Sequence, residues 1–130
     1  MPGHQRIAPG SPFEEQTGFT RAIRVDKRIL VSGTVGIEAD GSVAADAAAQ
    51  ADRCFALILD HIAQMGGTAL DLVRVRMFVT DMADADAVSA SFARHCRAAR
   101  PTATLVGIAA LYDPRWKVEI EAEAVLGTES

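Results

Sequence analysis

Charged and apolar residues alternate without interruption over residues 117–124, which read KVEIEAEA. Successive side chains of a strand point to opposite faces, so this segment predicts a strand with one apolar face and one charged face. We expect the apolar face to pack on a core. The three carboxylates on the other face require water, cations from a neighbouring strand, or a ligand that uses them.

The same alternation, or a short apolar run between turn residues, predicts four further strands. They span residues 19–26, 28–35, 72–80 and 102–110. A two-residue turn joins the first two into a hairpin. In the strand over 72–80, Arg74 and Arg76 share one face. If that strand lies beside the closing strand, we expect the two arginines opposite Glu119 and Glu121, where they offset the repulsion between the carboxylates.

Two amphipathic helices are predicted between these strands. The first has apolar residues spaced by three and four from Ala48 to Met65 and ends at two glycines. The second begins at Asp81 or Asp84 and ends before Pro101. The first 17 residues contain three prolines and two glycines and are predicted to be an irregular lead-in. Residues 18–127 are predicted to form a single domain.

This order of elements predicts an α+β domain with one mixed sheet and two helices on one face. Each helix follows the chain from one strand to the next, which implies at least one parallel strand pair. Two helices cannot cover both faces of the sheet, so we expect the other face to be an oligomer interface. The residues expected on that face are Arg21, Arg74, Arg76, Phe78, Glu119 and Glu121.

Composition and charge narrow the class of protein. A chain of 130 residues, 49% of them hydrophobic, predicts one globular domain. The net charge of -4 and the lack of a basic run argue against a nucleic-acid partner. No signal-peptide pattern and no run of about 18 apolar residues is present, so we expect no membrane association and a cytoplasmic location.

No metal site or cofactor site is predicted. Cys54 and Cys96 lie in separate predicted helices, which disfavours a disulfide or a zinc site. The three histidines, His4, His61 and His95, lack the spacing of metal ligands or of a catalytic triad. No glycine-rich phosphate loop is present. We therefore expect a protein that works without a cofactor.

Four segments carry a resemblance to a known family. They are GFTRAI at 18–23, VSGT at 31–34, VRMFVTDM at 75–82, and residues 100–101 followed by VEIE at 118–121. In this order and spacing the chain, over about residues 17–126, resembles the RidA/YjgF family, also called the liver perchloric-acid-soluble protein or reactive-intermediate deaminase family. The resemblance implies a chorismate-mutase-like α+β fold, a homotrimer, and ligand clefts between subunits.

The resemblance also implies a chemistry. The best-studied branch of the family hydrolyses enamines and imines, such as 2-aminoacrylate, to 2-oxo acids and ammonia without a cofactor. Its arginine anchor for the substrate carboxylate falls at Ala103, and a usual tyrosine falls at Phe19. Glu119 matches the acidic residue that positions or activates water. Ser32 and Gly33 match a tight backbone at the cleft.

Each of these residues also has a purely structural interpretation. Glu119 is one carboxylate of three on a polar strand face. Ser32 and Thr104 offer hydroxyl groups to a ligand, but a serine before a glycine is also typical of a local turn. These two readings, structural and functional, predict different consequences for removing each side chain.

The cation missing at Ala103 has two candidate replacements. The first is Arg21, which the alternation places on the same strand face as Phe19, although a hairpin or interface arginine is the simpler interpretation. The second is Arg115, in the turn before the last strand. If Arg21 is the replacement, its removal abolishes binding of a small carboxylate.

Two functions of different classes follow. One is a cofactor-free hydrolase or deaminase acting on a small enamine or imine that does not present a carboxylate. The alternative is a non-catalytic, trimeric metabolite-binding protein that has kept the cleft. Endoribonuclease activity, another label of the family, is not expected. The net charge is acidic, and the sequence lacks the aromatic residues beside basic ones on which RNA bases would stack.

Overall fold

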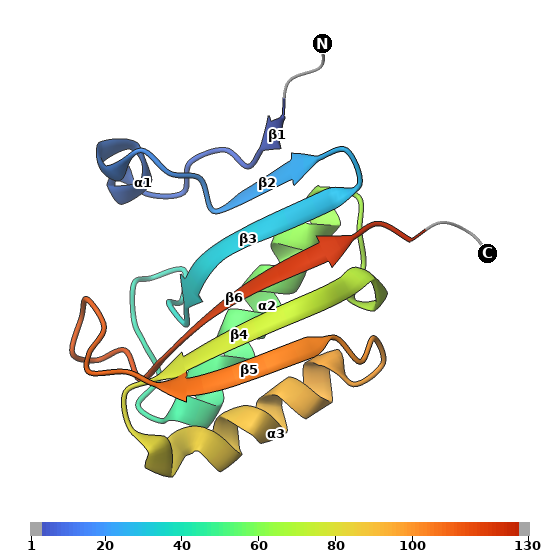
Figure 1. The fold of residues 1–130 in the computed structure, drawn as a ribbon. Helices are drawn as coiled ribbons and strands as arrows, with labels where there is room; N and C mark the ends of the chain where they lie inside the picture. The colour runs from blue at the N-terminus through green and yellow to red at the C-terminus, as the bar shows by residue number, and fades with distance from the viewer. Residues whose placement is uncertain (1–3, 128–130) are drawn as a thin grey trace.

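The protein is built on a six-stranded sheet in the order β1-β2-β3-β6-β4-β5 (Figure 1). The structure is a computed structural model that describes residues 4–127. β4 and β5 run parallel, and all other neighbours are antiparallel. The strands are β1 (Gln5–Arg6), β2 (Ala22–Val25), β3 (Arg28–Val35), β4 (Leu72–Val79), β5 (Thr102–Gly107) and β6 (Val118–Val125). The predicted mixed sheet is therefore confirmed.

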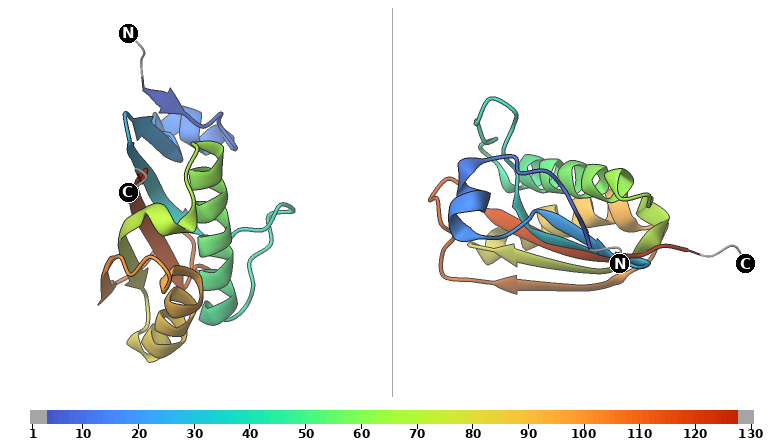
Figure 2. Two further views of the ribbon diagram at one scale, coloured as in Figure 1. Left: turned by 90° about the vertical axis from the view of Figure 1, so that its right-hand side faces the viewer. Right: turned by 90° about the horizontal axis from the view of Figure 1, so that it is seen from above.

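Two helices cover one face of this sheet. Figure 2 shows α2 (Ala47–Gln64) and α3 (Ala85–Cys96) in one layer, while α1 (Pro12–Thr17) lies on the side of the sheet where β2 begins (Figure 1). Two 3-10 helices, η1 (Ala69–Asp71) and η2 (Met82–Asp84), flank β4. Within residues 4–127 no helix covers the opposite face, which we call the open face. Its charged residues on β4 and β6 are Arg74, Arg76, Glu119, Glu121 and Glu123.

The core lies between α2 and the sheet. The helix predicted from Ala48 to Met65 is confirmed as α2, and its apolar residues, spaced by three and four, face the strands. The Asp46 carboxylate begins α2 by accepting a hydrogen bond of 3.1 Å from the amide of Ala49, and Gly66, at φ +94°, follows its end. The buried side chains of α2 include Ala51, Cys54, Phe55, Ile58 and Ile62.

The two helices are joined by a polar cluster around Asp52. Its carboxylate accepts hydrogen bonds from Ser91 Oγ at 2.6 Å and Arg94 Nη2 at 2.8 Å, and lies 3.1 Å from His95 Nε2. Burial acts to raise the pKa of Asp52, but these hydrogen bonds outweigh it and hold the pKa below its usual range. The cluster therefore ties α2 to α3 through an ionised carboxylate.

The lead-in is more regular than predicted. β1 pairs with β2, and α1 begins at Pro12 after Ser11, so the prediction of an irregular segment over residues 1–17 is wrong at these two places. Residues 1–3 lie outside the described part of the chain. A strand of two residues and a helix of six are too short to leave a periodic signal in the sequence.

The cross-strand pairing of charges is partly as predicted. β4 does neighbour β6, and Arg76 lies opposite Glu121. Arg74, however, lies opposite Glu123, because the two strands run antiparallel and the register carries the earlier arginine to the later glutamate. Glu119 consequently lies opposite Phe78 and has no arginine across from it on β4.

Candidate functional site

A β-bulge in β3 brings Gly33 against Glu119. Val31 pairs with Ala122 and Thr34 with Ile120, so two residues of β3 lie between positions that are two residues apart on β6. A Cβ at position 33 would lie 2.9 Å from Cδ of Glu119, a distance that real Cβ atoms do not show. Glycine at position 33 therefore leaves the space that the Glu119 carboxylate occupies.

The Glu119 carboxyl group is half-buried and has no ion-pair partner within residues 4–127. Burial raises its pKa, and the neighbouring carboxylate of Glu121 raises the pKa further. Within residues 4–127 no side chain forms an ion pair with Glu119, whereas Glu121 and Glu123 are paired with arginines. Glu119 also affects Cys54 of α2: burial and the charge of Glu119 raise the pKa of the Cys54 thiol to about 12. A carboxyl group in this setting exchanges a proton closer to neutral pH than an exposed one.

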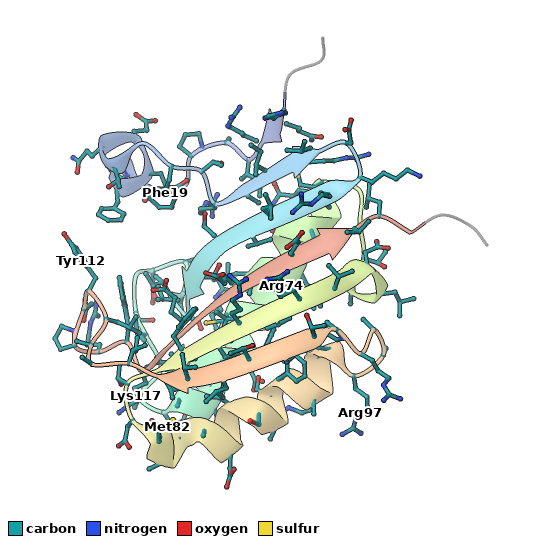
Figure 3. The ribbon with its side chains drawn as sticks, viewed as in Figure 1. Phe19, Arg74, Met82, Arg97, Tyr112 and Lys117 are labelled. Carbon is teal, nitrogen blue, oxygen red and sulfur yellow. The ribbon has the colours of Figure 1, made fainter. Side chains whose placement is uncertain are left out.

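A shallow groove of about 360 Å³ runs along the open face, and Glu119 is not among the residues that line it. Ser32, next to the bulge, lines it, and its hydroxyl donates a hydrogen bond of 2.6 Å to the carbonyl of Thr20. Figure 3 shows Arg74 lying over this face of the sheet. The groove is lined by residues of β2, β3, β4 and β6 and the segment before β2, among them Phe19, Thr20, Ser32, Arg74, Arg76 and Glu121.

The two arginines of the groove each face a glutamate carboxylate. Arg76 Nη1 lies 3.0 Å from Glu121 Oε2, and Arg74 Nε lies 3.9 Å from Glu123 Oε1. Glu123 is also held by Arg28, at 2.6 Å. Two arginines therefore share the Glu123 carboxylate, and Arg74, at the longer distance, is the more weakly paired of the two arginines of the groove.

Arg21 points away from the groove. Its Nε lies 3.3 Å from Oε1 of the buried Glu14, and its Nη2 donates to the carbonyl of Ala8 at 3.2 Å. Burial and the charge of Arg21 together lower the pKa of His61 on α2. Phe19 lines the groove and Arg21 does not, because β2 begins only at Ala22 and strand alternation does not govern the preceding residues.

The other predicted site residues lie on β5 and in the turn before β6. Thr104 lies opposite Arg76 and shares the open face, whereas Ala103 lies opposite Val75 on the helix side of this edge strand. β4 separates both residues from β6. Arg115 is bound to Asp113 through hydrogen bonds of 3.1 and 2.9 Å. One chain therefore brings Ser32, Gly33 and Glu119 together, but not Ala103.

Sequence reasoning missed an aromatic cluster at the end of the sheet where β6 begins. The rings of Phe13 and Phe19 lie 5.9 Å apart, and those of Phe13 and Tyr112 lie 5.7 Å apart. Figure 3 shows Phe19 and Tyr112 at this end. The signal in the sequence is weak, because three separate segments contribute one ring each. We call Phe13, Phe19 and Tyr112 the aromatic cluster.

Comparisons with known proteins decide the family. A family model described as Endoribonuclease L-PSP matches residues 10–126. The chain belongs to this family, which is also the RidA/YjgF family. Among curated relatives of the L-PSP family, an uncharacterized protein of Streptomyces coelicolor, SCO2049, is 31% identical over 124 residues, which cover 95% of this chain and 92% of that protein. The resemblance seen in the sequence motifs is confirmed.

Solved structures of L-PSP family members confirm the fold. Rv2704 from Mycobacterium tuberculosis, described as a member of the YjgF/YER057c/UK114 family, is 33% identical with a TM-score of 0.88, covering 95% of this chain and all of that one. The YjgF gene product of E. coli is 30% identical with a TM-score of 0.76, covering 82% and 87% of the two chains. The predicted α+β fold of this family is therefore shown.

Two further observations bear on the class of site. No group of three or more histidine, cysteine, aspartate or glutamate side chains in residues 4–127 is placed to hold a metal ion. Among the helices of the same residues, none has the length and apolar character needed to span a bilayer. The candidate site is the Glu119 carboxyl group over Gly33, and Ser32, the neighbour of Gly33, connects it to the groove on the open face.

Proposed function

We propose that this L-PSP family protein hydrolyses a small imine or enamine that carries no carboxylate, with Glu119 as the group that activates water. The observation that supports this function is the setting of Glu119. Its carboxyl group lies over Gly33, half-buried, with a raised pKa and without a cation from the described residues. A general base works best when its pKa lies near the working pH, and burial moves a carboxyl group in that direction.

The proposed reaction balances without a cofactor. Glu119 takes a proton from water as the water oxygen bonds to the imine carbon, which leaves a carbinolamine. The proton taken by Glu119 passes to the imine nitrogen as the carbinolamine forms. The nitrogen then takes a second proton, and the C–N bond breaks with its electron pair going to nitrogen while the hydroxyl group gives up its proton, so that the carbonyl compound and ammonia, or an amine, leave. An enamine first accepts a proton at carbon to become the imine. Nothing is oxidised or reduced.

The absence of a carboxylate from the substrate follows from the charges of the site. Ala103 supplies no cation, and both arginines of the groove face glutamates. Arg21 and Arg115 are held by Glu14 and Asp113. A substrate carboxylate would have to compete with these glutamates for an ionic partner, and a carboxylate that loses water without gaining such a partner costs free energy. Phe19, Ser32, Gly33 and Thr104 remain as the proposed ligand-binding residues.

An exchange at position 103 tests this specificity. We propose that the ligand cleft lies between subunits of a homotrimer, where position 103 of a neighbouring subunit meets the Glu119 site. The wild type is expected to hydrolyse a neutral imine, such as that of acetone, faster than 2-iminopropionate. Ala103→Arg is expected to raise kcat/KM for 2-iminopropionate by about tenfold or more, because a charge-assisted bidentate contact contributes about 1.5–3 kcal/mol. The assay follows ammonia release, with Ala103→Gln as an uncharged control. Rapid turnover of 2-iminopropionate by the wild type would contradict the proposal.

A non-catalytic metabolite-binding protein is the second candidate function. It is favoured by the substitution of alanine at the position where the deaminase branch has arginine. The two functions differ in one measurement: a binding protein retains its ligand unchanged, whereas the hydrolase releases ammonia from it. The net charge of -4 and the glutamates beside both arginines of the groove argue against cleavage of RNA.

We also propose that the open face forms the interface of a homotrimer. Apolar side chains on this face, Leu30 and Val106, are exposed in the single chain. Sedimentation is expected to show three times the chain mass of 13.8 kDa. Val106→Glu is expected to lower this mass by placing a charge in the interface, while Leu70→Glu, exposed on η1, is expected to leave it unchanged. A wild type that sediments as a monomer would contradict the proposal.

A further inference from the structure

The aromatic cluster gathers three of the seven aromatic residues of the chain at one exposed place. Tyr112 is 86% exposed, Phe13 47% and Phe19 39%. They come from the loop before β6, from α1, and from the segment between α1 and β2. Single exposed apolar residues are ordinary, but three rings in contact from three segments form a patch of the kind that marks a binding site.

The loop that carries Tyr112 is held in place by neighbouring groups. The carbonyl of Arg115 accepts a hydrogen bond of 3.0 Å from the Gln50 side chain of α2, and the amide of Trp116 donates to the carbonyl of Asp113 at 3.0 Å. Asp113 and Arg115 add a two-point ion pair. Tyr112 therefore lies next to a segment that these hydrogen bonds hold in place. Less conformational entropy is lost on binding when a loop is already ordered.

The geometry of the rings favours another ring as the occupant. Phe13 meets Phe19 edge-to-face at 73° and Tyr112 at 49°, which are arrangements that aromatic side chains adopt with one another. Phe13 lies between the other two, so Phe19 and Tyr112 keep ring surface for a further partner. Tyr112 is 86% exposed, so its hydroxyl group is accessible to a polar atom of a ligand.

The cluster also adjoins the groove on the open face. Phe19 belongs to both the cluster and the groove, and the groove reaches Ser32, the neighbour of Gly33. Figure 3 shows Tyr112 and Phe19 at the end of the sheet where β3 ends and β6 begins, and Glu119 is the second residue of β6. A volume of about 360 Å³ suits a small molecule rather than a peptide or a second protein.

We infer that Phe13, Phe19 and Tyr112 bind an uncharged aromatic ring, and that the substrate of Glu119 is an imine or enamine that carries such a ring. The second half of this inference rests on the proposed function, and the first half does not. By stacking and apolar burial, the aromatic ring of the substrate supplies the binding free energy that the arginine–carboxylate contact supplies in the deaminase branch of the family. The products are an aryl ketone or aldehyde and ammonia or an amine.

Binding of two matched ketones tests the inference without requiring catalysis. Acetophenone carries the aromatic ring and acetylcyclohexane carries a saturated ring of the same size, and neither has a charge. We expect the full chain to bind acetophenone at least several-fold more tightly in ligand-observed NMR titrations. Tyr112→Ala and Phe13→Ala are each expected to weaken acetophenone by about 2- to 10-fold, as follows from the usual strength of an aromatic pair. Leu70→Ala, at another exposed apolar residue, is the matched control.

The outcomes separate this inference from the proposed function. Equal affinity for the two ketones, or unchanged acetophenone binding by Tyr112→Ala, overturns the inference. A change of oligomeric mass in Tyr112→Ala also overturns it, because the cluster would then be an interface between copies. Glu119→Gln is expected to keep its acetophenone affinity. Ring-selective binding without imine hydrolysis supports the first half of the inference and refutes the proposed function. Imine hydrolysis at the same rate in the wild type and Tyr112→Ala supports the proposed function and refutes the inference.

Discussion

Glu119→Gln is expected to reduce hydrolysis of a neutral imine by about 10²–10⁴-fold in kcat, the usual contribution of a positioned general base. Glutamine keeps the size of the side chain over Gly33 but cannot accept a proton from water. Ammonia release from the imine of acetone, measured at one pH for both proteins, checks this expectation. The loss should fall on kcat rather than on the affinity for a ketone product.

The pH dependence gives a second readout for Glu119. A base must be ionised to act, so the activity of the wild type is expected to fall as the pH drops through the pKa of Glu119. Burial and the charge of Glu121 raise that pKa, so the fall should occur at a higher pH than for an exposed glutamate. The ratio of wild-type to variant rates removes the pH dependence of the uncatalysed reaction.

Stability separates a catalytic glutamate from a structural one. Because the pKa of Glu119 is raised in the folded state, its ionised form lowers the free energy of unfolding at neutral pH, and this cost disappears as the pH falls below the pKa of the unfolded chain. Glu119→Gln is therefore expected to be as stable as the wild type or more so. Glu38→Gln, which loses an ion pair with Arg53 outside the groove, is the matched control and is expected to keep its activity. An active Glu119→Gln protein would refute the proposed role.

Phe55→Ala is expected to lower the free energy of unfolding by about 3–5 kcal/mol, the range for removing a buried phenylalanine ring. Phe55 is 1% exposed between α2 and the sheet, and its ring lies 5.3 Å from that of His95 and 6.3 Å from that of Phe92. The alanine would leave a cavity. The hydrogen bonds of Asp52 hold α2 and α3 in place, so the two helices cannot move together to close it. Urea unfolding at a fixed protein concentration measures the loss.

Phe92→Ala provides the comparison for this prediction. Phe92 meets the same ring from α3 but is only partly buried, so its replacement should cost less than that of Phe55. The order of the two losses matters more than either value, since it follows from burial alone. A Phe92→Ala protein less stable than Phe55→Ala would show that the core is organised around α3 rather than α2.

The fold could be predicted closely because its signals are local. The alternation over residues 117–124 became β6, and the spacing from Ala48 to Met65 became α2. The parallel pair of β4 and β5 also follows from local information, because a helix crossover between them leaves no other arrangement compact. Where the signal was short, as in α1 and β1, the prediction was wrong.

The candidate site depended on contacts that no local pattern encodes. The sequence alone determined the mixed sheet, the amphipathic helices, the family motifs, and the alanine at position 103. Only the tertiary structure decided that Glu119 lies over Gly33 and opposite Phe78, that Arg21 turns to Glu14, and that three distant rings meet. Periodicity reports which face a side chain takes, whereas register, bulges and loop packing depend on residues far apart in the chain.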